Sequence, residues 1–563
     1  MDKSIYRNVY SLSSKSKFLG KIKVFASSRW ITFEMFSKLT SFFDKDKFEF
    51  INEEDSLKLS VDFDSNIKTD GFILDVRQKA ISIQVSDNRG LLYAIDTLNN
   101  LAKKSDEGFE IPIILIEDEP SFTHRGIIEG FYGTPWSFEE RIDMIDFMRH
   151  NRLNTYIYAP KTDEYHRAKW CDLYPEDLLT EITLVFDKAK ENHIDFFYTI
   201  SPGYIKEGEY AFDYLNELDF QRLFRKLDQF IDLGITSYGL LLDDIDYQLT
   251  DKQKTIFSRP GIAHAYICNR MNEYLKEKIK NYQMVMCPTE YHQIGESRYR
   301  QDLKENLDKN IKVFFTGDNV CAEAITKSDI EMTRKAFGND LFIWDNFPVS
   351  DFTYGVREYL APIRNRYSKI SDYASGYFIN PSLHYHISKI GMQTMAEYAW
   401  NSEGYNPDNA FERALREIDE VFYKEGKNFV EFVYPSVVSY GKLHEYNQLV
   451  IKKDYQSIIK LYDGLKKSAE ELLDLNLKII EELEPWLKHA IAEDEMVRKL
   501  IHGNVSKEEL LIYLQDKHFL GMDLIDKLIC ESKLLSDKEY QDLVTKRRGV
   551  QWYRVFEEKR WKK

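Results

Sequence analysis

Two adjacent carboxylates, Asp243 and Asp244, follow the apolar run Gly239-Leu240-Leu241-Leu242. An uninterrupted apolar run is typical of a strand that is buried on both faces. At the end of such a strand each carboxylate opposes ionisation of the other, which can keep one protonated and one charged near neutral pH. That combination suits a reaction that needs a proton donor beside an anion. A solvated surface pair without a catalytic role is the alternative.

The region around this pair, residues 119–400, repeats a strand, a loop and a helix. We expect strands at residues 126–131, 155–159, 194–200, 237–242, 284–288, 312–316, 341–344 and 376–379. Helical patterns lie between them, among them 137–150, 179–192, 220–233, 262–279 and 328–337. Ser137 and Glu140 form a capping box at the start of the first helix. Eight strands that mostly alternate with helices favour a (β/α)8 barrel of the α/β class over a doubly wound open sheet.

Polar residues follow most of these strands. The strand ends lead into Glu129-Gly130, Pro160-Lys161, Asp243-Asp244, Glu290-Tyr291, Asp345-Asn346 and Asn380-Pro381. The carboxyl ends of barrel strands meet at one mouth, where barrel enzymes place their sites. We therefore expect these side chains to form one site.

Two further domains are expected on either side of the barrel. Residues 1–118 mix an alternating strand pattern at 80–85 with a helical pattern at 90–98, which indicates a small α/β domain. Residues 401–563 carry helical patterns, and 442–489 is a long helical pattern with apolar residues at three-four spacing. That apolar stripe favours a bundle core over a partner site.

Composition limits the classes of partner. The chain has 563 residues, of which 43% are hydrophobic and 30% charged, as in globular proteins of several domains. A net charge of −16 disfavours nucleic acid and anionic membranes. The start of the chain lacks a signal-peptide pattern, and no apolar stretch is long enough for a membrane span. We therefore predict a cytoplasmic protein, with no oligomeric state assigned.

No metal or cofactor is expected. The five cysteines have no metal-ligand spacing, and a sparse, odd set fits a reducing compartment rather than a disulfide framework. His384 and His386 are spaced as two metal ligands can be, but the sequence assigns no carboxylate or cysteine to them.

The strand-end motifs resemble glycoside hydrolase family eighty-four, which contains the retaining β-N-acetylglucosaminidases. The matching segments are RGIIEGFYGTPW (125–136), NTYIYAPK (154–161), YHR (165–167), LDDI (242–245), PTEY (288–291), TG (316–317), WDN (344–346) and NP (380–381). They span the expected barrel in the family's order. One departure is Ser382-Leu383-His384-Tyr385-His386, where the family usually has a polar stretch.

The resemblance implies substrate-assisted catalysis, in which the 2-acetamido oxygen of the sugar attacks the anomeric carbon and forms an oxazoline. It assigns Asp243 to the acetamido nitrogen and makes Asp244 the acid and then the base. In the implied sugar pocket, Tyr291 lies near the acetamido oxygen and Trp344 forms an apolar wall. Sugar hydroxyls are assigned to Lys161, the Gly130 carbonyl, Asn346, Asp351 and Asn380.

The resulting prediction is an exo-acting β-N-acetylglucosaminidase, similar to an O-GlcNAcase, that acts on N-acetylglucosamine-bearing glycans or glycoproteins. A hyaluronidase-like endo-hydrolase is one alternative. A non-catalytic sugar-binding protein on the same barrel is another, although it predicts loss of one aspartate, and both are present. A scaffold whose helical domain binds a partner is the third.

Overall fold

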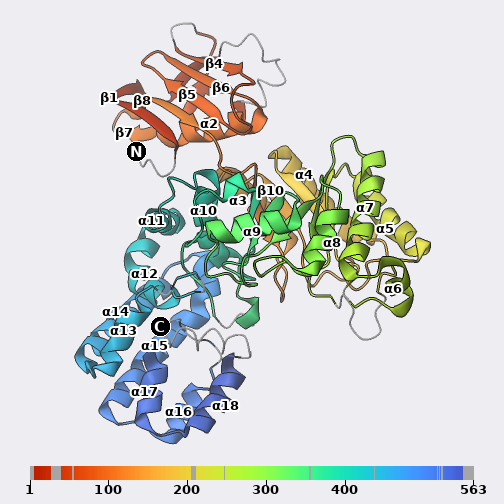
Figure 1. The fold of residues 1–563 in the computed structure, drawn as a ribbon. Helices are drawn as coiled ribbons and strands as arrows, with labels where there is room; N and C mark the ends of the chain where they lie inside the picture. The colour runs from red at the N-terminus through yellow and green to blue at the C-terminus, as the bar shows by residue number, and fades with distance from the viewer. Residues whose placement is uncertain are drawn as a thin grey trace.

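The structure is a computed structural model in which three parts follow one another along the chain (Figure 1). It describes residues 6–26, 40–53, 56–203, 211–245, 248–353, 357–436, 438–439, 441–516, 518, 520 and 524–548. The first part is built on a mixed sheet, the second on a closed barrel and the third on helices. This arrangement confirms the predicted fold class.

The first part is a mixed sheet, against which the described residues place helix α2. Its strands are β1 (Asn8–Leu19), β2 (Ile22–Ala26), β3 (Phe48–Phe50), β4 (Leu57–Phe63), β5 (Phe72–Val76), β6 (Ala80–Val85), β7 (Lys103–Ser105) and β8 (Gly108–Asp118). Within the described residues they lie in the order β1-β8-β5-β6-β4-β2-β3, with β7 beside β8. Helix α2 (Asn88–Leu101) starts at Asp87, whose side chain accepts the N–H of Gly90. The alternating pattern of β6 buries every second residue, as a half-exposed strand does.

The second part is a closed barrel of parallel strands. They are β9 (His124–Glu129), β10 (Thr155–Tyr158), β11 (Asp195–Ile200), β12 (Ser237–Leu241), β13 (Gln283–Cys287), β14 (Lys312–Phe315), β15 (Leu341–Asp345) and β16 (Ala374–Ile379), and β16 pairs with β9. Each strand lies where an apolar run predicted it. Among the strand starts, the largest differences are at β9 and β16, which begin two residues before their predicted first residues, Gly126 and Gly376.

Helices surround the barrel. They are α3 (Phe138–His150), α4 (Glu176–Glu191), α5 (Glu217–Asp232), α6 (Asp251–Phe257), α7 (Pro260–Lys278), α8 (Arg298–Asn306), α9 (Lys327–Phe337) and α10 (Tyr385–Trp400), with short 3-10 turns η1 (Asp351–Thr353) and η2 (Ile370–Asp372). The predicted capping box is confirmed at α3, where Ser137 accepts the N–H of Glu140 and the Glu140 side chain accepts the N–H of Ser137. Helices α6, α8 and α10 had no counterpart among the helices named from the sequence.

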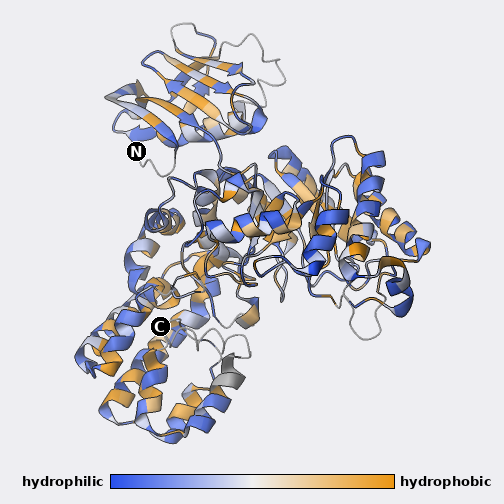
Figure 2. Cartoon of the chain, in the orientation of Figure 1, coloured by the Kyte–Doolittle hydropathy of each residue, from blue (hydrophilic) through white to orange (hydrophobic). Residues whose placement is uncertain are grey.

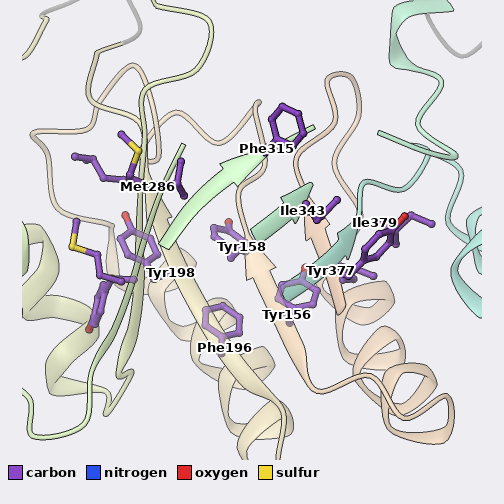
Figure 3. Packing of buried hydrophobic residues seen from close by; sticks show 14 of the residues in the cluster. Tyr156, Tyr158, Phe196, Tyr198, Met286, Phe315, Ile343, Tyr377 and Ile379 are labelled. Atoms are coloured by element: carbon purple, nitrogen blue, oxygen red, sulfur yellow. The ribbon is translucent and has the colours of Figure 1, made fainter. Parts of the chain in front are cut away.

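Strand side chains alternate between two cores. On β10, Ile157 points into the barrel with residues such as Phe197 and Phe342, whereas Tyr156 packs between strands and helices. Figure 3 shows this outer layer, which includes Tyr198. Many of the aromatic residues are therefore core, and apolar residues gather on strands and on inward helix faces (Figure 2).

The third part is a helical region, α11 (Pro407–Ile418), α12 (Glu420–Val433), α13 (Leu443–Ile451), α14 (Tyr455–Leu473), α15 (Lys478–His502), α16 (Lys507–Tyr513), α17 (Leu524–Ser532) and α18 (Asp537–Arg548). The long helical pattern predicted over 442–489 is divided among three helices, α13, α14 and the start of α15. Lys453 has a left-handed φ of 57° and Asp454 caps the next helix, so the chain turns there although the apolar spacing continues. No helix in the described part of the chain is long and apolar enough to cross a membrane.

Trp400 joins the barrel to the first part. Its side chain is 2% exposed and packs in the core of the mixed sheet. The indole Nε1–H donates to Asp118 at 2.9 Å, and Arg152 donates to the same carboxylate oxygen at 2.9 Å. One carboxylate at the end of β8 thus holds residues from the beginning and the end of the barrel.

Candidate active site

The two aspartates after β12 face different surroundings. The strand leads through buried Leu241 and Leu242 to Asp243, which is 4% exposed, whereas Asp244 is exposed. Between them the backbone turns sharply, since Asp244 has a left-handed φ of 55°. Aspartate is among the few residues that tolerate this conformation. The turn separates the environments of two side chains that are adjacent in sequence.

Asp243 is paired with the buried Lys161, which follows β10. The Lys161 ammonium donates to Oδ2 of Asp243 at 2.5 Å and lies 5.3 Å from the centre of the Trp344 ring. Burial alone would raise the pKa of Asp243, but the charge and hydrogen bond of Lys161, with the charge of Arg167, hold this pKa below its usual range. Asp243 is therefore a buried anion at neutral pH.

The two oxygens of Asp243 differ in their partners. Among the residues that the structure describes, no other residue donates a hydrogen bond to its Oδ1, although this atom is buried. A buried carboxylate oxygen without a donor is costly. The cost is offset when a bound molecule brings an N–H or O–H group to that oxygen.

Asp244 is held by two tyrosines. Tyr132, in the loop after β9, donates its O–H to Oδ2 at 2.8 Å, and Tyr291, after β13, donates to Oδ1 at 3.2 Å. Burial and the nearby Asp244 charge raise the pKa of both phenols, so each remains a donor at neutral pH. Arg167 donates to the Tyr132 hydroxyl at 3.2 Å and adds a third residue to this chain of contacts.

A chain of amides forms another side of the site. The Gly130 N–H donates to Oδ1 of Asn380 at 3.2 Å, and the Asn380 amide donates to Oδ1 of Asn346 at 2.9 Å. Asn346 in turn donates to the Val320 carbonyl at 2.7 Å. These contacts fix the orientation of both asparagine amides. A Cβ at Gly130 would lie 2.4 Å from Cζ2 of Trp344, so only glycine fits against that ring.

Asp351 lies beside this chain, in η1 after β15. Its Oδ2 accepts the backbone N–H of Tyr132 at 2.8 Å. Burial raises its pKa, and the backbone donors of Tyr132 and Phe352 only partly oppose that effect. Tyr132 therefore touches Asp244 with its hydroxyl and Asp351 with its backbone.

These contacts join the predicted site residues at the mouth of the barrel, the carboxyl ends of β9–β16. Lys161 contacts Asp243, Tyr291 contacts Asp244, and Trp344 packs against Gly130 and Lys161. Sequence analysis missed Tyr132 and Arg167 as site residues. Tyr132 lies in the segment RGIIEGFYGTPW and Arg167 in the segment YHR, so their place in these motifs could have indicated a role in the site.

His384 and His386 take no part in these contacts. The His384 ring pairs with Glu358, a carboxylate partner that sequence analysis did not assign. No group of three or more histidine, cysteine, aspartate and glutamate side chains suited to a metal ion occurs in the described part of the chain.

Two family models match the chain. One, described as beta-N-acetylglucosaminidase, matches residues 125–433, and the other, domain 2 of glycosyl hydrolase family 20, matches residues 35–119. The first model covers β9 to β16 and all the site residues described above.

Curated relatives and solved structures agree with this match. The Protein O-GlcNAcases of Rattus norvegicus and Mus musculus are each 32% identical over 290 residues, which is 50% of this chain and 31% of theirs. The chain thus spans about a third of the length of these relatives.

The structure called CpGH84B has a TM-score of 0.81 at 23% identity and covers 94% of this chain and 99% of its own. An O-GlcNAc hydrolase mutant from Thermobaculum terrenum has a TM-score of 0.66 at 26% identity, over 77% of this chain and 98% of its own. The likeness to CpGH84B shows the shared fold alone. Since the family model matches over half of the sequence, the chain belongs to the beta-N-acetylglucosaminidase family, glycoside hydrolase family eighty-four.

Proposed function

We propose that the chain is a retaining exo-β-N-acetylglucosaminidase that removes terminal β-linked N-acetylglucosamine through an oxazoline intermediate. The observation that carries this proposal is the buried anion Asp243, which has one oxygen paired with Lys161 and the other without a donor among the described residues. Membership of the family supports the substrate class.

In the first step the acetamido oxygen of the sugar attacks the anomeric carbon, and the bond from that carbon to the leaving oxygen breaks. Oδ1 of Asp243 accepts the acetamido N–H, which orients the amide for attack. Positive charge develops on the nitrogen as the oxazoline forms, and the nearby anion stabilises it. Lys161 keeps Asp243 ionised so that it can perform both tasks.

Asp244 serves the leaving group. It gives its proton to the departing oxygen and then removes a proton from the water that opens the oxazoline. Attack by the amide and then by water inverts the anomeric carbon twice, so the configuration is retained. The hydroxyls of Tyr132 and Tyr291 hold the carboxylate formed after proton transfer.

The remaining residues recognise the sugar. Asp351 and the amides of Asn346 and Asn380 supply acceptors and donors for hydroxyls, and Trp344 supplies an apolar surface. Oriented groups of this kind reject an analogue that lacks their partner. The expected substrates are N-acetylglucosamine-bearing glycans or glycoproteins, and the free cysteines favour a reducing compartment.

The direct test uses aryl β-N-acetylglucosaminides whose acetamido groups carry increasing numbers of fluorine atoms. The rate should fall with each fluorine, because fluorine withdraws electrons from the attacking oxygen. An NMR spectrum of the first product should show the β anomer. A rate that ignores fluorination, or an α product, would refute the proposed mechanism.

Role assignment needs two matched amide variants. Asp244→Asn should slow substrates with poor leaving groups much more than activated ones, because the latter need no acid. Asp243→Asn should slow both alike, because it removes the anion that orients and stabilises the amide. Equal losses across leaving groups for Asp244→Asn would remove the acid role. Activity confined to internal bonds of hyaluronan would favour the endo-acting alternative.

A further inference from the structure

A buried polar cluster lies behind the loops that carry Asp351 and Asn380. At its centre Glu358 is 2% exposed and accepts three side-chain hydrogen bonds. The donors are the hydroxyl of Ser350 at 2.8 Å, the hydroxyl of Ser382 at 2.7 Å and Nδ1 of His384 at 2.8 Å. The two serine hydroxyls also lie 3.1 Å apart.

The cluster joins two loops of the proposed sugar pocket. Ser350 directly precedes Asp351 in the loop after β15, and Ser382 lies two residues beyond Asn380 in the loop after β16. The backbone N–H of Val349 donates to the Asn380 carbonyl at 3.1 Å and adds a direct link. Glu358 therefore sets the distance between two of the residues assigned to sugar hydroxyls.

The helical region contacts the same cluster. On α15, Glu482 accepts the backbone N–H groups of His386 and Ile387, each at 2.9 Å, and so satisfies the first turn of α10. The Trp486 ring meets the His384 ring edge-on at 5.3 Å. The helical region thus holds the start of α10, which follows the Asn380 loop.

We propose that Glu358 and His384 are positioning residues for sugar binding, and that α15 supports them from the helical region. The inference rests on the proposed function, since it assumes that Asp351 and Asn380 bind sugar hydroxyls. Contacts to hydroxyls remote from the broken bond are made equally in the ground state and the transition state, so their loss raises KM with little change in kcat.

The charge of His384 gives this arrangement a pH dependence. Burial lowers the pKa of His384, but the hydrogen bond and charge of Glu358, with the charge of Glu482, raise it above its ordinary value. The carboxylates of Glu358 and Glu482 act on the His384 ring. The His518 ring packs on Trp486, with the two ring centres 5.1 Å apart. Below the raised pKa the cation–carboxylate pair is intact. As pH rises through that pKa the charge is lost, and the two loops are held less firmly.

The cluster around Glu358 includes residues of the segment 382–386, where the sequence departs from the usual pattern of the family. Ser382 and His384 both belong to that segment, and both donate to Glu358. Two of the five residues in that segment therefore share one partner.

The test measures kcat and KM for an aryl β-N-acetylglucosaminide across pH. We expect Glu358→Gln and His384→Gln to raise KM by about tenfold or more, the size of one hydrogen bond to a charged group, with kcat within about twofold. In the wild type KM should rise as pH passes through the His384 titration, and in His384→Gln this rise should be absent. Glu482→Gln should raise KM less, because Glu358 keeps its hydrogen bonds with Ser350, Ser382 and His384 in that variant.

His386→Gln is the matched control, because His386 lies two residues beyond His384 and its ring has no described contact with Glu358. This variant should leave KM and its pH profile unchanged. Thermal unfolding shows whether each variant is folded, and if Glu358→Gln fails to fold, His384→Gln decides, since its side chain is 23% exposed. A wild-type chain without hydrolytic activity would refute the proposed function. An active wild type with unchanged KM and pH profile in folded Glu358→Gln and His384→Gln would refute this inference alone.

Discussion

Replacing Lys161 by methionine tests the electrostatic premise of the site. The change keeps a long apolar side chain against Trp344 but leaves the buried Asp243 carboxylate without its only hydrogen-bonded cation among the described residues. Removing one partner of a buried ion pair typically costs about 3–5 kcal/mol. If that energy is what keeps Asp243 ionised, kcat/KM at neutral pH should fall by about 150- to 5,000-fold, at about 1.36 kcal/mol for each factor of ten.

The pH dependence separates this effect from a lost sugar contact. In the wild type the pKa of Asp243 is lowered, so the pair stabilises the fold above the ordinary aspartate pKa, and this stability is lost as pH falls through the lowered value. Without Lys161, burial raises the pKa of Asp243. The acid limb of the kcat/KM profile should therefore move to higher pH, and stability at neutral pH should fall.

The assay is the kcat/KM profile for an activated aryl substrate, which needs little help from Asp244. Lys312→Met is the matched control, because Lys312 begins β14 at the opposite end of the barrel from the site. An acid limb that stays at the wild-type pH while activity drops would mean that Lys161 only binds sugar. The electrostatic reasoning would then be refuted.

Three further substitutions test separate contacts. Tyr132→Phe removes one donor to Asp244 but keeps the backbone, so kcat should fall roughly tenfold with KM nearly unchanged in steady-state kinetics, as expected for a hydrogen bond to a charged group. Gly130→Ala brings a Cβ 2.4 Å from Trp344, so overpacking should cost about 1–3 kcal/mol in denaturant unfolding and raise KM. Trp400→Phe removes the indole N–H that donates to Asp118 at the end of β8, so the free energy of unfolding should drop by about 1–3 kcal/mol while kcat/KM is unchanged. A normal kcat for the first, a normal KM for the second or normal stability for the third would contradict the assigned contact.

The barrel could be predicted because its signals are local. Most strands contain an apolar run that is buried on both faces, as β12 does, and Ser137 and Glu140 mark the start of α3 within four residues. Helix α8 escaped prediction because its sequence RYRQDLKEN is nearly all polar and offers little apolar periodicity. The break at Lys453 was missed because the apolar spacing continues on both sides of it.

The predicted site residues came from motif order, whereas their contacts came only from the structure. Tyr132 and Asp244 are 112 residues apart, and no local pattern links them. Glu358 stands between Arg357 and Tyr359 in the sequence, and these neighbours do not indicate its contacts. Its partners are Ser350, Ser382 and His384. Pairings between distant segments depend on how the strands close into a barrel, and a single sequence contains no direct record of them.

The left-handed backbone at Asp244 limits which substitutions can be interpreted there. Asparagine shares the tolerance of aspartate for that geometry, so an amide at this position reports the missing acid and little else. Alanine, glutamate or a β-branched residue would also strain the bend, by about 1–2 kcal/mol for an ordinary L-residue. Loss of activity in those variants would mix chemistry with a displaced main chain, and the neighbouring anion would move with it.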